Sequence, residues 1–167
     1  DDGFGCDREF DRGHGYYIAM YLHTVMYGNG SSLSGPVPKA LTVFRDAYLY
    51  SGDIRYGRAC AILLDRIADF YPDYDWYQWH DLRGEEYRGN IVDPIWSNFL
   101  AVLFSQCYDA VFPVYDDPEL IATLRKKAAR QGLDNPKACG DDLRFHVEDR
   151  ILRTIFRDAV MCKLHGN

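Results

Sequence analysis

The stretch IRYGRACAILLDRIADFY, residues 54–71, carries the clearest helical pattern in the chain. Apolar side chains recur at the three- and four-residue spacing of one helix face, at Cys60, Leu63, Leu64, Ile67 and Tyr71. Most of the charged side chains lie off this face, at Arg58, Asp65, Arg66 and Asp69. Pro72 then blocks continuation of the helix. The stretch therefore predicts an amphipathic helix that packs through one side.

A second helix is predicted directly before it, over residues 38–50. Pro38 suits the first turn of a helix, and Ser51-Gly52-Asp53 is a strong breaker at the other end. Asp53 is also a good N-cap for the helix that follows. Residues 38–71 therefore predict a helical hairpin with a tight turn.

The rest of the chain is also helical in pattern. Four more helices are expected, over residues 16–27, 95–112, 118–130 and 142–164. The helix predicted for 95–112, the fourth of the six, is apolar on nearly every face, which is typical of a helix buried on all sides. The helix predicted for 142–164 has an apolar stripe formed by Ile151, Ile155, Ala159 and Cys162. Its basic flank is formed by Arg150, Arg153 and Arg157. No strand is predicted, so the expected fold class is all-α, built from antiparallel helical hairpins.

Length and charge restrict the protein classes further. The 167 residues, 47% of them hydrophobic, can form one helical domain over 1–167, with 1–15 as a poorly ordered lead-in. The net charge of −6 argues against a general nucleic-acid or anionic-membrane binder. No run approaches the ~18 apolar residues of a membrane span. We therefore expect neither nucleic acid nor membrane as a partner.

Metal and cofactor motifs are absent from the sequence. There is no phosphate-binding glycine loop, no dinucleotide fingerprint and no HExxH pair. The five histidines share no helical spacing, and the five cysteines include no CxxC pair. Cys60, Cys107 and Cys162 fall on apolar helical stretches, where cysteine usually acts as a small buried hydrophobe. We expect no metal and no cofactor.

Residues 73–90 form a long segment without helical period, which is rich in aromatic side chains. Loops of this length are often functional, and Trp76, Trp79 and His80 are candidates for sugar binding. The alternative is a loop held in place by its aromatic side chains. Tyr17 is a candidate cleft residue, with helix packing as its alternative. The loop carries five acidic and two basic residues, a balance that does not favour an anionic sugar.

Four segments, in order, resemble the N-terminal helical domain of heparinase II/III-like polysaccharide lyases. They are AYLYSGD (47–53), LLDRIADFYP (63–72), GNIVDPIW (89–96) and CYDAVFP (107–113), and the resemblance extends over residues 16–167. It implies an incomplete (α/α) toroid of hairpins, a periplasmic or secreted location, and an acidic, uronate-containing polysaccharide as partner. The family's catalytic stretch follows the last helix, where Asn167 matches the Asn that neutralises the uronate carboxylate and a His lies further on.

The reaction that the resemblance implies is β-elimination. Hydrogen bonds to the carboxylate stabilise the developing charge, and a Tyr or His removes the proton. Because the sequence stops at Asn167, we expect an N-terminal fragment that is incomplete for catalysis, with apolar helix faces, above all 151–162, that expose a patch or drive self-association. The alternative is a helical glycan- or protein-binding module without catalysis.

Overall fold

The computed structural model describes residues 35–71 and 94–157 of the chain. Every regular element in these two ranges is helical, which confirms the predicted all-α class. The elements are α2 (Pro36–Ser51), α3 (Ile54–Phe70), α5 (Pro94–Val111), the 3-10 turn η3 (Phe112–Asp116), α6 (Pro118–Gln131), α7 (Gly140–Val147) and the π-helical turn η4 (Glu148–Leu152). Helical residues 153–157 follow η4. The helix predicted for 16–27 lies outside the described residues, and the toroid remains a prediction.

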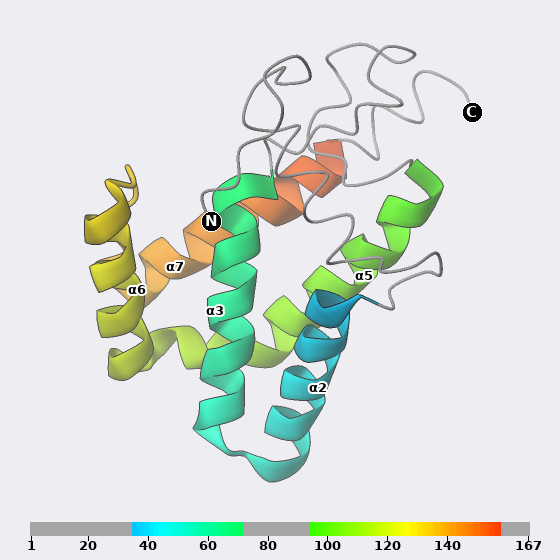
Figure 1. Cartoon of the computed structure of the whole chain (residues 1–167), viewed down its shortest axis with the longest axis horizontal. Helices are drawn as coiled ribbons and strands as arrows, with labels where there is room; N and C mark the ends of the chain where they lie inside the picture. Colours follow the sequence, from blue (N-terminus) through cyan, green and yellow to red (C-terminus); the bar gives the residue numbers. More distant parts are fainter. Residues whose placement is uncertain (1–34, 72–93, 158–167) are drawn as a thin grey trace.

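Helices α2 and α3 lie side by side and are joined at one end by a two-residue turn (Figure 1). Gly52 ends α2 in the left-handed region, with φ 68°, where a residue without Cβ is favoured. The Asp53 side chain then accepts a hydrogen bond of 3.0 Å from the backbone N–H of Arg55. The predicted cap is therefore present, and the turn is produced by the local sequence alone.

Helix α5 packs across both α2 and α3, and the main core lies between these three helices and α7. Aromatic contacts join the elements: the rings of Tyr71 and Phe104 meet edge to face at 5.9 Å. The prediction that this helix is buried on all sides is wrong, because Phe99 is 51% and Val102 56% exposed. One face of α5 packs on the core, and the other is open to solvent.

The η3 turn brings the chain back against α3. The Val114 and Tyr115 side chains are buried there, and Gly57 of α3 makes the close approach possible. A Cβ at Gly57 would lie 2.8 Å from Val114 Cγ2. Asp117 then caps α6, since its carboxylate accepts a 2.9 Å hydrogen bond from the backbone N–H of Leu120.

The C-terminal helical run packs on α3 and α5 through α7 and η4. Ile151, the first residue of the predicted apolar stripe, is fully buried, and Ile155 is packed against the same core. This part of the stripe therefore does not form the exposed patch that was predicted, while Ala159 and Cys162 lie outside the described residues. Among the described helices, none combines the length and apolarity needed to cross a bilayer.

Candidate functional site

A second face of α3 carries two buried carboxylates. Asp65 and Asp69 are four residues apart, so they lie on the same side of the helix. Their side chains are only 1% and 2% exposed. This corrects the interpretation of α3 as a helix with one buried stripe and a polar outer face. Both faces are covered, because α6, the 132–139 loop and α7 pack over the acidic one.

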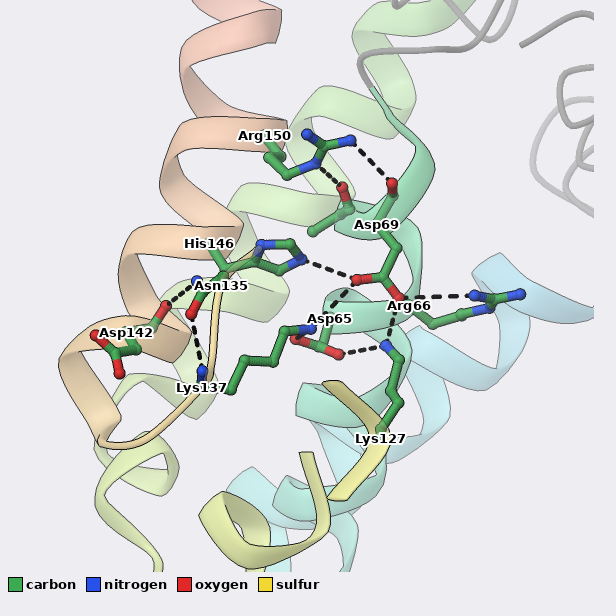
Figure 2. A network of polar contacts seen from close by, with 10 residues as sticks. Asp65, Arg66, Asp69, Lys127, Asn135, Lys137, Asp142, His146 and Arg150 are labelled. Carbon is green, nitrogen blue, oxygen red and sulfur yellow. Dashed lines mark hydrogen bonds and ion pairs between the residues drawn. The ribbon is translucent and has the colours of Figure 1, made fainter. Parts of the chain in front are cut away.

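Two lysines neutralise these carboxylates (Figure 2). Lys127 of α6 places its ammonium 2.5 Å from Asp65 Oδ2 and also contacts Asp69 Oδ2. Lys137 donates to Asp65 Oδ1 at 2.6 Å and to Asp69 Oδ1 at 3.2 Å. Buried charges persist in proteins when they are paired in this way. We call Asp65, Asp69, Lys127, Lys137 and His146 the α3 ion cluster.

Lys137 reaches the cluster from an irregular loop and is itself fully buried. Its φ of 51° is in the left-handed region, which costs a residue with a Cβ roughly 1–2 kcal/mol. Asn135 supports this conformation: its Oδ1 accepts from the Lys137 backbone N–H at 2.9 Å, and its Nδ2 donates to the Asp142 carbonyl at 3.0 Å. The loop is thus held in a conformation that directs an ammonium into the protein.

His146 of α7 completes the cluster. Its Nε2 lies 3.0 Å from Asp69 Oδ1. Because a carboxylate only accepts hydrogen bonds, Nε2 carries the proton and donates it to this contact. Asp69 therefore determines the orientation and tautomer of the ring.

The pKa of Asp69 reflects opposing effects. Burial alone raises the pKa of this carboxyl, but the hydrogen bond from His146 and the nearby ammonium groups of Lys127 and Lys137 lower it more strongly. The pKa consequently lies below its ordinary value, and Asp69 is ionised over the whole neutral range. Asp69 therefore acts as a charged hydrogen-bond acceptor for its neighbours.

Arg150, which belongs to the basic flank noted in the sequence, contacts the end of α3. Its Nε donates to the Ala68 carbonyl at 2.7 Å and its Nη2 to the Asp69 carbonyl at 2.9 Å. These are carbonyl groups in the last turn of α3, which lack partners within the helix. Arg150 thus caps the C-terminus of α3, and Arg153, which is largely exposed, pairs with Asp149 at 3.2 Å. The proposed basic flank is engaged in contacts within the protein.

The cluster also contains a possible set of metal ligands. One atom each from Asp65, Asp69 and His146 lie within 4.8 Å of one another. The same carboxylate oxygens, however, already bind the ammonium groups of Lys127 and Lys137. A divalent ion would have to displace both lysines and leave buried ammonium groups unpaired, which is costly. The arrangement therefore fits an ion-pair network that joins α3, α6 and α7.

A half-open cavity of about 360 Å³ lies beside His146. Its polar lining includes the carboxylates of Asp134 and Asp149 and the side chain of Arg150. Carboxylates outnumber cationic groups here, and Arg150 is bound to the end of α3. The cavity is therefore a poor place for an anionic sugar.

The candidate residues taken from the sequence, Tyr17, Trp76, Trp79, His80 and Asn167, all lie outside the described residues. The structure instead brings together side chains that the sequence did not single out. The one available signal was the pair Asp65 and Asp69, four residues apart on an amphipathic helix. Lys137 and His146 had no signal, because they are 68 and 77 residues away from Asp69 in the chain.

Comparison with known proteins identifies no relatives. No family model matches the chain, and neither the curated proteins nor the solved structures include a match.

Proposed function

We propose that this chain is the helical scaffold of a polysaccharide lyase that cleaves uronate-containing polymers by β-elimination. The observation that supports the proposal is the packing of the segments that resemble the lyase family. Residues 47–53 make the turn between α2 and α3, residues 63–71 supply core side chains on α3, and residues 107–113 end α5 against η3. Three of the four segments thus lie at a helix end or supply core side chains, while 89–96 falls largely outside the described residues.

The described acid–base groups suit a scaffold better than a reaction centre. His146 is hydrogen-bonded to Asp69, and Tyr108 donates to Glu148. Burial and this hydrogen bond raise the pKa of Tyr108, which makes it a weaker acid than a free tyrosine. A lyase base has to accept a proton from substrate, so neither group is placed for that task. The proposal accordingly assigns carboxylate neutralisation to Asn167.

Ultraviolet absorbance of unsaturated uronate products tests the proposal directly. The full-length product of the gene is incubated with a panel of uronate polymers, and absorbance is expected to rise with at least one of them. Asn167→Ala should abolish the rise while circular dichroism remains unchanged, because a neutralising donor contributes about 10²–10³ in kcat. Absence of product from every polymer would contradict the proposal.

The second candidate is a glycan-binding module without catalysis, favoured by Trp76 and Trp79 in one aromatic segment. Affinity electrophoresis in gels that contain each polymer separates the two candidates. Binding alone would be indicated if a polymer retards the protein but yields no unsaturated product, and if the Trp76→Ala and Trp79→Ala variants are no longer retarded. Mobility that no polymer changes would exclude glycan binding by this chain.

A further inference from the structure

Three helices meet at one backbone carbonyl in the core. The Leu41 oxygen on α2 lies 3.9 Å from Cys60 Sγ on α3 and 3.8 Å from Cys107 Sγ on α5. Both cysteines are free thiols with no solvent exposure. Since both sulfur atoms contact the same oxygen, two thiols that are distant in sequence are close neighbours in space.

The environment makes the two thiols chemically unequal. A hydrogen bond between them and their burial raise the pKa of Cys60, which favours its thiol form. The same hydrogen bond lowers the pKa of Cys107, and the guanidinium of Arg45 assists by stabilising the Cys107 thiolate. A thiol with a lowered pKa next to one with a raised pKa favours deprotonation of Cys107 first, and the thiolate so formed is the nucleophile of disulfide chemistry.

Arg45 is a partly exposed charged side chain that interacts electrostatically with both thiols. Its side chain is 17% exposed, and its Nη1 donates to Gln106 Oε1 at 2.9 Å. Gln106 is exposed and directly precedes Cys107 in the chain. Cys107 therefore lies one residue from an exposed position, although its own side chain has no solvent exposure.

We propose that Cys60 and Cys107 form an oxidative modification site, at which a hydroperoxide converts the two thiols to a disulfide that links α3 to α5. The Cys107 thiolate attacks a peroxide oxygen and becomes a sulfenic acid, and the O–O bond breaks with release of hydroxide. The Cys60 sulfur then attacks the Cys107 sulfur and displaces hydroxide, while the Cys60 proton is released. In total, two thiols and one hydrogen peroxide give one disulfide and two waters.

The disulfide would have a structural consequence. It encloses residues 61–106, so that the end of α3, the aromatic segment 73–90 and the start of α5 become a closed loop. Closing a loop of this length restricts the unfolded chain and raises the melting temperature of the oxidised protein. Oxidation is therefore expected to stabilise the packing of α3 on α5.

The experiment uses the full chain with Cys6→Ser, Cys139→Ser and Cys162→Ser, which leaves only the two thiols of interest. After stoichiometric hydrogen peroxide, the protein is denatured and treated with a maleimide. We expect the number of labelled thiols to fall from two to none, and the intact mass to fall by about 2 Da, the two thiol hydrogens. Adding Cys60→Ser should leave a labelled or oxidised Cys107 and no mass loss.

Arg45 variants test the mechanism separately from the geometry. Arg45→Met should slow disulfide formation, because loss of the guanidinium raises the pKa of Cys107 and lowers its thiolate fraction. Arg45→Lys retains the positive charge and should stay near the parent rate. Two labelled thiols after peroxide in a folded protein would overturn the proposal, as would a disulfide that forms only in denaturant.

Discussion

Replacing Lys137 by Met removes one of the two ammonium groups that neutralise Asp65 and Asp69. The methionine retains most of the side-chain volume, so the change removes charge and little packing. Asp65 Oδ1 would lose a 2.6 Å contact and Asp69 Oδ1 a 3.2 Å contact in a region where both carboxylates are almost fully buried. The variant therefore contains one uncompensated negative charge in the interior.

Loss of one partner from a buried ion pair costs about 3–5 kcal/mol. With a urea m-value of about 2 kcal/mol/M, the unfolding midpoint should fall by about 2 M. Urea titration followed by circular dichroism at 222 nm, a helix band, measures both quantities at neutral pH, about pH 7. Lys126→Met provides the matched control, since Lys126 is exposed on the same helix as Lys127 and should change stability by no more than about 0.5 kcal/mol.

A second substitution shows whether the lost stability is due to the unbalanced charge or to the lost contacts of Lys137. Adding Asp65→Asn to Lys137→Met restores charge balance in the α3 ion cluster, so part of the lost stability should return. A Lys137→Met variant as stable as the Lys126→Met control would refute the argument that these carboxylates require two ammonium groups.

Three further predictions concern the same described region. Because the folded-state pKa of Asp69 is depressed, its contribution to stability is complete above the unfolded pKa of about 4 and is lost as pH falls toward the folded value; urea midpoints should drop below pH 4, and Asp69→Asn should flatten that profile at lower stability. Gly57→Ala should destabilise the protein by about 1–3 kcal/mol through overlap with Val114, although Ala normally favours a helix by about 1 kcal/mol. A raised melting temperature would contradict this. The same Gly57→Ala change should cost less when it is made in a Val114→Ala protein than in the parent. Asp117→Ala should cost about 0.5–2 kcal/mol as a lost cap, whereas Asp117→Asn retains the cap and loses only the ion pair with Arg58; thermal melts that rank Asn below Ala would be inconsistent with capping.

Local signals in the sequence were sufficient for α2, α3, α5 and α6 and, to within about two residues, for their ends. Pro and Gly positions, the Asp53 and Asp117 caps and the apolar spacing of 54–71 act through neighbouring residues, so they specify the same local structure wherever the chain places them. The all-α class followed from these signals. The π-helical turn at 148–152 had no such signal, and neither did the exposed face of α5.

The candidate site was beyond the reach of these patterns. Burial of Asp65 and Asp69 depends on which elements cover the second face of α3. The covering elements are α6, the 132–139 loop and α7, which follow α3 much later in the chain. A charged residue off an apolar stripe is equally compatible with solvent and with a buried ion pair, because helical periodicity reports only one packing face. The opposing charges that decide the outcome lie far away in sequence.

The sequence by itself determined where α2, α3, α5 and α6 begin and end, and that the turn between 38–50 and 54–71 is tight. Only the tertiary structure decided that Lys137 and His146 meet Asp69, and that Cys60 and Cys107 meet at Leu41. The physical reason is range: caps, turns and helical spacing act over a few residues, whereas ion pairs and thiol pairs form between segments that only packing brings together.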